Sequence, residues 1–330
     1  MDFMKKNIAV IFGGNSSEYE ISVLSGQNIF NNIDTEIFNV FAVHLHQQEW
    51  TVTSEPYEGM IVNKDNFSFQ KNDVIIKFDC AFIAIHGTPG EDGKIQAYFE
   101  LLNIPYTSCG FLTSSITFDK FTCNSFLKHF DVLSPKSILL REKDVPNLQQ
   151  IVDEVGLPCF VKPNNGGSSC GASKVKHLDD LTVAIEKAFK EDRSVIVEQY
   201  ILGTEITCGV SKLNGKIHIF PLVEIVSKKE FFDYEAKYNP LLAEEILPAR
   251  IPDNKAEKCK QIATRVFELL HCKGFVRMDF ILKGNQFYFL EVNTVPGMTK
   301  NSIVPKMVLA EGKTIKEFCT SVIEDALTQK

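Results

Sequence analysis

Two carboxylates and an amide stand close together in the segment with the strongest chemical signal. The apolar run 276–293 reads as a β-hairpin whose first strand carries Arg277 and Asp279 and whose second strand carries Glu291 and Asn293. A three-residue loop would set Asp279 opposite Glu291 and Arg277 opposite Asn293, so that these side chains point the same way. Mg²⁺ takes hard oxygen ligands of this kind, together with phosphate and water. The spacing therefore predicts a magnesium site on one face of the hairpin.

The register of this hairpin has an alternative. A two-residue turn would move Asp279 opposite Leu290, and the segment would then be a surface hairpin in which Arg277 pairs with a carboxylate. The period-two alternation of a strand also predicts that Phe287, Phe289, Glu291 and Asn293 share one face.

A glycine-rich segment, 164–171 (NNGGSSCG), is the second chemical signal. Glycines let backbone N–H groups approach an anion closely. The segment partly matches a P-loop, but Ala172 and Ser173 stand where Lys and Ser/Thr are required, and strand-like sequence follows. We expect a turn between two antiparallel strands that folds over nucleotide phosphates, with Lys162 and Lys120 as phosphate ligands. A flexible hairpin with a surface lysine is the alternative.

The N-terminal third must position further groups at the ends of its strands. Apolar runs read as strands at 7–12, 38–46 and 80–85. The first runs into Gly13-Gly14 and the third into His86-Gly87, and ligands of open α/β sheets bind at such strand ends. Ser17 and Glu20 have the spacing of a helix capping box, which predicts a helix after the first strand.

The remainder alternates helices and strands. Turn-forming residues mark a boundary at 103–108, and the run 194–200 reads as a strand. Helices are expected over 114–130 (carrying Lys120), 178–190, 253–273 and 314–327.

The composition excludes several classes of protein. Of 330 residues, 44% are hydrophobic and 23% charged, which is enough for a normal core. The net charge of −7, without a long basic run, argues against a nucleic-acid partner. No run of about 20 apolar residues occurs and no signal peptide is recognisable, so we expect no membrane partner. Nine cysteines without a CxxC pair indicate reduced thiols and a cytoplasmic location.

Seven motifs in order carry a family resemblance. They are GGNSSEYEIS near the start, HGTPGEDGKIQ at 86–96, KPNNGGSSCGASKV at 162–175, EQYILGTEIT at 198–207, FFDYEAKY at 231–238, GFVRMDF at 274–280 and EVNTVPGMTKNSIVP at 291–305. With them the chain resembles the D-alanine–D-alanine ligases of the ATP-grasp superfamily, from about residue 6 to the C-terminal helix.

The resemblance implies an α/β fold of three domains. An open Rossmann-like α/β domain would span 1–108, and the ATP-grasp fold would comprise a central domain, 109–197, and a C-terminal domain, 198–330. It also implies a reaction that consumes ATP and needs Mg²⁺ or Mn²⁺, with two ions expected. One D-alanine carboxylate takes the γ-phosphate, and the amine of a second D-alanine displaces phosphate, giving a dipeptide for peptidoglycan synthesis. A homodimer is implied as well.

The resemblance further implies roles for residues around the two D-alanines. Glu18 would bind the ammonium of the first D-alanine, and His86 would lie near its carboxylate. Each also has a purely structural interpretation, Glu18 as a carboxylate at a helix start and His86 as a strand-end histidine bonded to backbone. Arg277 and the N–H of Gly297 would stabilise the oxyanion. The carboxylate of the second D-alanine would be received by Ser302 and Ile303.

Nucleotide and metal ligands are implied in the same way. Lys120 and Lys162 would contact the α- and β-phosphates, and Glu198 and Glu205 the adenine amino group and the ribose. Family members often have Lys in place of Gln199, whose expected contact is through backbone. The implied ATP-binding residues are Lys120, Lys162, Gly167, Ser168, Ser169, Glu198, Gln199, Ile201, Glu205, Lys237 and Asn293, and the implied metal ligands are Asp279, Glu291 and Asn293.

A lid is implied over about 228–250. Glu18, Ser168 and Tyr238 would form a hydrogen-bonded set that fastens it, so that water is kept from the acyl phosphate, and Lys237 would reach the γ-phosphate. An exposed Ω-loop is the alternative for this segment.

Three competing functions remain at this point. The nearest is a ligase of the same fold that joins D-alanine to D-lactate or to another D-residue. A nucleotide-binding module without turnover is disfavoured, because all proposed metal and phosphate ligands are present. A Rossmann oxidoreductase is disfavoured, because GxGxxG is missing.

Overall fold

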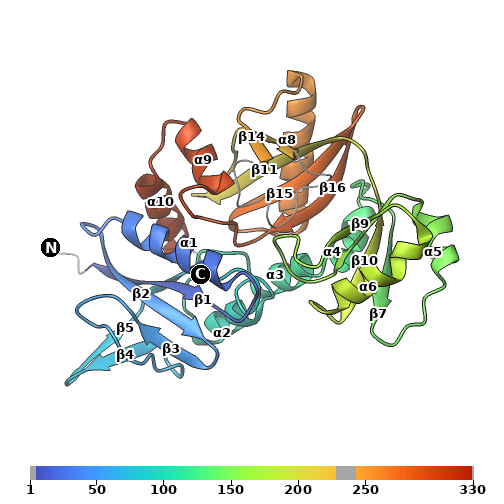
Figure 1. Ribbon diagram of the computed structural model, residues 1–330. Helices are drawn as coiled ribbons and strands as arrows, with labels where there is room; N and C mark the ends of the chain where they lie inside the picture. The colour runs from blue at the N-terminus through green and yellow to red at the C-terminus, as the bar shows by residue number, and fades with distance from the viewer. Residues whose placement is uncertain (1–4, 228–242, 329–330) are drawn as a thin grey trace.

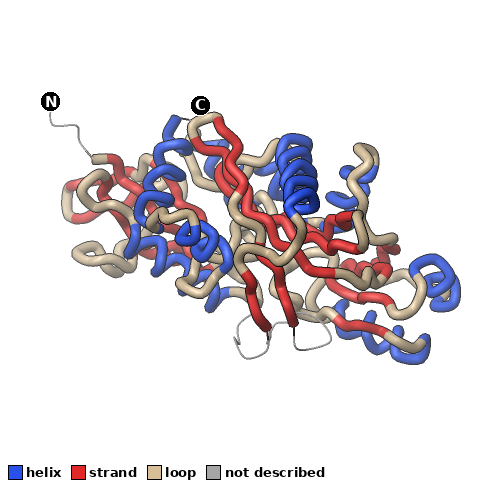
Figure 2. Tube along the Cα trace, turned by 90° about the horizontal axis from the view of Figure 1, so that it is seen from above, coloured by secondary structure: helices blue, strands red, loops and turns tan. Residues whose placement is uncertain are grey.

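The computed structural model describes residues 5–227 and 243–328. It contains three main sheets, and Figures 1 and 2 show them side by side along the molecule, with the sheet of residues 204–293 in the middle. The predicted lid residues Lys237 and Tyr238 lie outside the described residues.

The N-terminal sheet has the strand order β3-β2-β1-β6. Its strands are β1 (Lys6–Gly13), β2 (Phe38–His46), β3 (Glu49–Val52) and β6 (Cys80–Ile83). β1 pairs in parallel with β2 and β6, and only the edge strand β3 is antiparallel. Residues on both faces of β1 are buried, as in a parallel sheet covered on both sides. The prediction of an open α/β sheet is confirmed. A small hairpin that the sequence did not reveal, β4 (Ser68–Lys71) and β5 (Val74–Lys77), adjoins this sheet.

Helix α1 (Tyr19–Asn32) follows β1, but the predicted capping box is wrong. Glu18 occupies the N-cap position and makes no side-chain cap. Instead the Glu18 N–H donates to Ser16 Oγ at 3.2 Å. The carboxylate of Glu18 is thereby left to contact the glycine-rich loop.

The single helix expected over 114–130 is also wrong. Three helices link the first sheet to the second, namely α2 (Lys94–Leu102), α3 (Phe111–Phe118) and α4 (Lys120–Lys128). The chain breaks at Asp119, whose backbone is extended and whose carboxylate accepts the Thr122 N–H at 2.8 Å. A side-chain cap of this kind starts a new helix. Lys120 therefore stands at the first position of α4.

The second sheet is antiparallel, with the strand order β7-β10-β8-β9. Its strands are β7 (Ser137–Arg141), β8 (Cys159–Pro163), β9 (Ser173–Val175) and β10 (Ser194–Gln199). The helices packed on it are α5 (Leu148–Val155) and α6 (Leu181–Phe189), the latter preceded by the 3₁₀ turn η1 (Leu178–Asp180). The glycine-rich segment joins β8 to β9, which pair antiparallel as predicted.

The third sheet has the order β14-β13-β11-β15-β16, with β12 paired to β11. Its strands are β11 (Thr204–Leu213), β12 (Lys216–Ile219), β13 (Val223–Ser227), β14 (Ala243–Ile246), β15 (Gly274–Lys283) and β16 (Gln286–Asn293). Helix α8 (Asp253–Leu269) shares a core with one face of this sheet. The other face lines the pocket described below.

Two C-terminal helices join the first and third sheets. Helices α9 (Ile303–Ala310) and α10 (Ile315–Thr328) share one apolar core with β1, α1, β6 and β13. This core fixes the N-terminal sheet against the third sheet. Among the helices that the structure describes, none combines the length and the apolarity needed to span a bilayer.

Candidate active site

One cavity of about 1390 Å³ is lined by residues from all three sheets. Every predicted site residue within 5–227 and 243–328 lines it. These residues are Glu18, His86, Lys120, Lys162, Gly167, Ser168, Ser169, Glu198, Gln199, Ile201, Glu205, Arg277, Asp279, Glu291, Asn293, Gly297, Ser302 and Ile303. Segments far apart in the sequence thus meet at one place.

The hairpin β15–β16 has the predicted pairing at the site, but for a different reason. Its turn has two residues, Gly284 and Asn285, which alone would set Asp279 opposite Leu290. A β-bulge lies between the pairs Asp279–Glu291 and Phe280–Phe289, so Leu290 is the extra residue and the pairing is restored. The prediction of a three-residue loop is therefore wrong.

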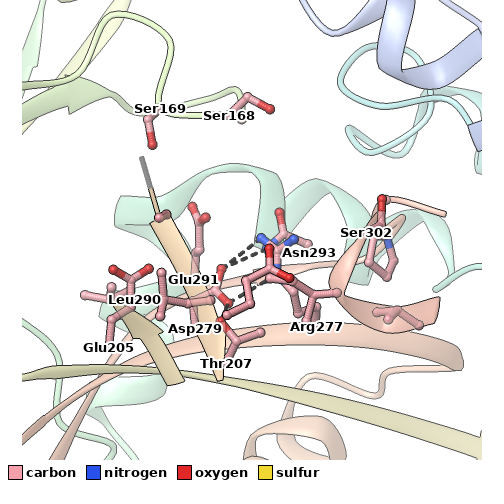
Figure 3. Close-up of a pocket in the computed structure, with 18 of the residues that line it drawn as sticks. Ser168, Ser169, Glu205, Thr207, Arg277, Asp279, Leu290, Glu291, Asn293 and Ser302 are labelled. Atoms are coloured by element: carbon pink, nitrogen blue, oxygen red, sulfur yellow. Dashed lines mark hydrogen bonds and ion pairs between the residues drawn. The ribbon is translucent and has the colours of Figure 1, made fainter. Parts of the chain in front are cut away.

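The bulge also changes which side chains share a face. Phe287, Phe289 and Val292 lie in the core with α8, whereas Leu290 and Glu291 both line the pocket. The prediction that the two phenylalanines share the face of Glu291 is wrong, because the bulge interrupts the alternation of period two. Figure 3 shows Leu290 beside Glu291 and Asp279.

Asp279 is held by three side chains (Figure 3). Arg277 forms an ion pair with it, with Nη2 at 2.9 Å from Oδ2 and Nε at 3.2 Å from Oδ1. Thr207 Oγ1 donates to Oδ1 at 2.9 Å, and Asn293 Nδ2 lies 3.4 Å from Oδ2. The alternative interpretation of this segment, a surface hairpin, also predicted that Arg277 pairs with a carboxylate. That ion pair is present, but it lies at the wall of the pocket and not on the outer surface.

The donor set fits a magnesium ion that also binds phosphate. In the part of the chain that the structure describes, no three His, Cys, Asp or Glu residues form a metal cluster. Asp279 and Glu291 are cross-strand neighbours, and Asn293 directs its amide nitrogen toward Asp279. Two carboxylates and an amide are an incomplete shell, and Mg²⁺ commonly completes such a shell with phosphate and water.

Two lysines reach the pocket, Lys162 from β8 and Lys120 from the start of α4. Lys162 Nζ lies 2.7 Å from Glu198 Oε2 across β8 and β10. Burial lowers the pKa of Lys162, but the charges of Glu198 and Glu291 outweigh this effect, and the net pKa is raised. Lys120 donates to the Gly166 carbonyl and lies 3.5 Å from Glu291 Oε2. Both lysines line the pocket, and each is paired there with a carboxylate.

The glycine-rich loop closes directly onto Glu18. Ser168 Oγ donates to Glu18 Oε1, and both residues are buried. Ser168 and Ser169 have left-handed backbones, with φ of 52° and 56°. A Cβ on Gly167 would lie 2.5 Å from Glu18 Oε2, so a larger residue here would displace the Glu18 carboxylate from the loop. Two members of the predicted set of Glu18, Ser168 and Tyr238 are therefore in contact, and the third lies outside the described residues.

His86 is buried at the end of the N-terminal sheet. Its Nδ1 lies 2.9 Å from the Val295 carbonyl and its Nε2 3.0 Å from Ser25 Oγ. Burial lowers its pKa, although the charge of Glu18 acts in the opposite direction. His86 is thus a neutral histidine whose ring is fixed by two hydrogen bonds.

The loop after β16 brings Gly297 and Ser302 together. A Cβ on residue 297 would lie 2.9 Å from Ser302 Oγ. Ser302 Oγ accepts the Thr299 N–H at 3.0 Å, and Ser302 precedes α9 at its N-cap. A backbone N–H, a hydroxyl and a helix N-terminus that lie together favour an anion.

Several pocket residues were missed by sequence reasoning, and three of them bear directly on the predicted site. Glu91 accepts the Gly87 N–H at 2.7 Å, and burial together with the charge of Glu18 raises its pKa to about 8. Thr207 holds Asp279, and Leu290 lines the pocket because of the bulge. Glu91 and Thr207 belong to the motifs at 86–96 and 198–207, which could have drawn attention to them. The bulge has no sequence signal.

The fold and the pocket define an ATP-grasp ligase: an open α/β sheet, followed by two antiparallel sheets that enclose a lysine- and carboxylate-lined cavity beneath a glycine-rich loop. Comparison with known proteins identifies the family. The family description D-ala D-ala ligase N-terminus matches residues 7–109, and D-ala D-ala ligase C-terminus matches residues 126–324. The chain belongs to the D-alanine–D-alanine ligase family, so the predicted family, fold class and enzyme class are confirmed.

Similar proteins match over their full length. The D-alanine–D-alanine ligase of Parabacteroides distasonis is 45% identical over 328 residues, 99% of each chain. That of Phocaeicola vulgatus is 44% identical, over 98% of this chain and 99% of the relative. The structure of D-alanyl-alanine synthetase A from Vibrio cholerae has a TM-score of 0.88 and 30% identity, covering 99% and 100% of the two chains. The VanG D-Ala:D-Ser ligase of Enterococcus faecalis has a TM-score of 0.86 and 32% identity, covering 98% and 100%.

Proposed function

We propose that this chain joins two D-alanine molecules into D-alanyl-D-alanine, converts ATP to ADP and phosphate, and so supplies a peptidoglycan precursor. One observation carries the proposal. A single pocket holds Glu18 and His86 from the N-terminal sheet together with Lys162, Glu198 and the hairpin carboxylates of the other two sheets. An amino acid and a nucleotide can therefore meet within one pocket.

ATP would lie between the second and third sheets. Lys120 and Lys162 would bind the α- and β-phosphates, and the loop residues Gly167, Ser168 and Ser169 would supply backbone N–H groups. Glu198 Oε1 is buried and has no hydrogen-bond partner among the described residues, which suits an acceptor for the adenine amino group.

Other groups would complete the nucleotide site. Glu205 would bind the ribose, the backbone of Gln199 and Ile201 the adenine edge, and Lys237 the γ-phosphate. Asp279, Glu291 and Asn293 would hold Mg²⁺ or Mn²⁺, as one or two ions. When bound, the metal neutralises phosphate charge and orients the transferred group.

The first D-alanine would bind beside Glu18 and His86. Its carboxylate oxygen attacks the γ-phosphorus, the bond from that phosphorus to ADP breaks, and an acyl phosphate forms. Glu18 would hold the ammonium, and His86, neutral because of burial, would lie near the carboxylate without adding charge.

The second D-alanine would approach with its carboxylate on Ser302 and Ile303. Its amine, after losing a proton, attacks the acyl carbon, and phosphate leaves the tetrahedral intermediate. Arg277 and the Gly297 N–H would stabilise the oxyanion. Tyr238, with Ser168 and Glu18, would fasten the lid that excludes water.

The wider organisation is part of the same proposal. We propose domains of 1–108, 109–197 and 198–330, each built around one of the three main sheets, although β10 (Ser194–Gln199) of the second sheet runs across the second boundary. A cytoplasmic location is supported by the nine cysteines, all of which are free thiols. A homodimer is proposed from the family alone.

Phosphate release from ATP tests the proposal. We expect release with D-alanine and none with L-alanine, and mass spectrometry should identify the dipeptide. Release that needs D-lactate or D-serine as second substrate would favour the alternative ligase, and the Enterococcus faecalis relative is a D-Ala:D-Ser ligase of this kind. Binding of ATP without release in any mixture would indicate a module without turnover.

A further inference from the structure

Helix α1 touches the loop between β16 and α9 (residues 294–302, here called the catalytic loop because it carries the proposed donor Gly297) through two buried polar side chains that the proposed function does not use. Ser25 is fully buried and Asn28 nearly so. The Met298 N–H donates to Ser25 Oγ at 3.1 Å, and Asn28 Nδ2 donates to the Met298 carbonyl at 2.7 Å. The N–H and the carbonyl of Met298 are thus both held by one face of α1. Met298 lies 273 positions after Ser25 and 270 positions after Asn28 in the sequence.

The direction of each hydrogen bond follows from chemistry. The Val295 carbonyl can only accept, so His86 Nδ1 carries the proton that bonds to it. A neutral imidazole then has an acceptor at Nε2, which receives the Ser25 hydroxyl at 3.0 Å. The Ser25 hydroxyl therefore donates to His86 and accepts from Met298, so it has a partner both as a donor and as an acceptor.

This chain of bonds closes around Gly297. Val295 lies two residues before Gly297 and is held by His86, whereas Met298 follows Gly297 and is held by Ser25. Ser25 links these two contacts, because its hydroxyl also bonds to His86 Nε2. The backbone on both sides of the proposed oxyanion donor is therefore tied to α1, directly at Met298 and through His86 at Val295.

We propose that Ser25 is a positioning residue that sets the orientation of the Gly297 N–H and of the His86 ring for the ligation. The inference rests on the proposed function, because Gly297 and His86 are assigned there. Catalytic donors work only when they are already aimed at the charge that develops in the transition state. A displacement of about 1 Å can lower turnover about a hundredfold.

The same helix provides a matched control. Ser22 is also fully buried and lies one turn earlier on α1. Its hydroxyl accepts the Gly13 N–H at 2.8 Å and donates to the Ala84 carbonyl at 2.8 Å. These partners are strand ends and not the catalytic loop. Ser22→Ala and Ser25→Ala remove the same group from the same kind of environment, so a loss caused by folding alone should be similar in both.

The first measurement is steady-state turnover with D-alanine and ATP, corrected for folded protein. We expect Ser25→Ala to lower kcat about tenfold to a hundredfold, with KM for ATP within about twofold. Ser22→Ala should melt at a similarly reduced temperature but keep kcat within about threefold of the wild type. Asn28→Ala, which releases the other side of Met298, should shift kcat in the same direction. Equal turnover of Ser25→Ala and Ser22→Ala would overturn the proposal.

The second measurement is independent of activity. Nitrogen NMR of the histidine rings, with His86 assigned from the resonance lost in His86→Gln, reports which ring nitrogen is protonated. We expect a protonated Nδ1 and a hydrogen-bonded Nε2 in the wild type and in Ser22→Ala, and an Nε2 without its donor in Ser25→Ala. A protonated Nε2 in the wild type would contradict the network. Because this spectrum needs no substrate, failure of the network and failure of the proposed function are distinguishable.

Discussion

Glu91 gives the sharpest prediction about pH. It lines the pocket, accepts the Gly87 N–H at 2.7 Å and faces the charges of Glu18, Lys120 and Arg277. Burial and the negative charge of Glu18 raise its pKa from 4.5 to about 8, against the smaller opposing effects of Gly87, Lys120 and Arg277. We therefore expect Glu91 to stay protonated at neutral pH in the folded protein and to ionise in the unfolded chain.

The sign and size of the effect on stability follow from this difference. Folding takes up a proton between pH 4.5 and about 8, so the contribution of Glu91 is fully present below pH 4.5 and is lost as the pH rises. One extra bound proton changes the free energy of unfolding by about 1.4 kcal/mol per pH unit. Between pH 5 and pH 7 the wild type should lose about 2.5 kcal/mol through this group. The Glu91→Gln variant has no proton to take up at this position, so its free energy of unfolding should not show this loss.

Urea unfolding at pH 5, 6, 7 and 8 measures the effect as a difference between proteins. His86, with its lowered pKa, acts in the opposite direction, but it is present in both proteins and largely cancels. Glu20→Gln, at an exposed position of α1, is the control for removing a carboxylate. If the free energy of unfolding changes with pH in parallel for the wild type and Glu91→Gln, Glu91 is ionised in the folded protein and the reasoning is refuted.

Three further predictions concern the pocket. Gly167→Ala places a Cβ 2.5 Å from Glu18 Oε2 and should lower turnover with D-alanine about tenfold or more, whereas Gly110→Ala, where the nearest atom lies at 3.4 Å, should not. Lys162→Met leaves the buried Glu198 without its cation and should cost about 3–5 kcal/mol in urea unfolding; adding Glu198→Gln should restore much of that stability, and no recovery would mean that the pair is not the cause. Glu291→Gln should weaken Mn²⁺ binding, followed by electron paramagnetic resonance with ADP present, about tenfold or more, and an unchanged titration would exclude Glu291 as a ligand.

Much of the site could be predicted because its residues sit in motifs with chemical meaning. The glycine-rich turn, the strand-end histidine and the hairpin carboxylates each have a local pattern, and all of them line one pocket. The helices and strands that could be predicted are those with clear apolar periodicity, such as β1, β2 and α10.

The hairpin shows what local patterns cannot supply. The turn length predicted from the sequence was wrong and the pairing of Asp279 with Glu291 was correct, because the bulge at Leu290 compensates for the shorter turn. That bulge is fixed by distant parts of the chain. The Phe289 N–H donates to the Leu133 carbonyl at 2.7 Å, and Asn124 Nδ2 donates to the Leu290 carbonyl at 3.3 Å. Neither contact has a signal within the hairpin itself.

The break at Asp119 has a similar origin. The helical pattern runs on through this point, but the Lys120 N–H bonds to the Asn164 carbonyl at 3.3 Å, and the Phe121 N–H bonds to Asn164 Oδ1 at 2.9 Å. The start of α4 is therefore tied to the residue that opens the glycine-rich loop. This tie places Lys120 at the pocket, and it exists only in the folded chain.

The buried face of helix α1 is more polar than hydrophobic packing alone requires. An ordinary surface helix buries an apolar stripe, yet the buried residues of α1 include Ser22, Ser25 and Asn28 along with Gly26 and Ile29. Gly26 lets the helix approach β1 closely, since a Cβ there would lie 2.5 Å from Phe12. At that close distance the inward polar groups must all find partners, and each of the three does so. Together with Glu18 at the helix start they give one face of α1 contacts with the glycine-rich loop, the strand ends, His86 and Met298. A buried helix face this polar contributes little hydrophobic free energy, so its sequence is better explained by the positions that it fixes than by the area that it buries.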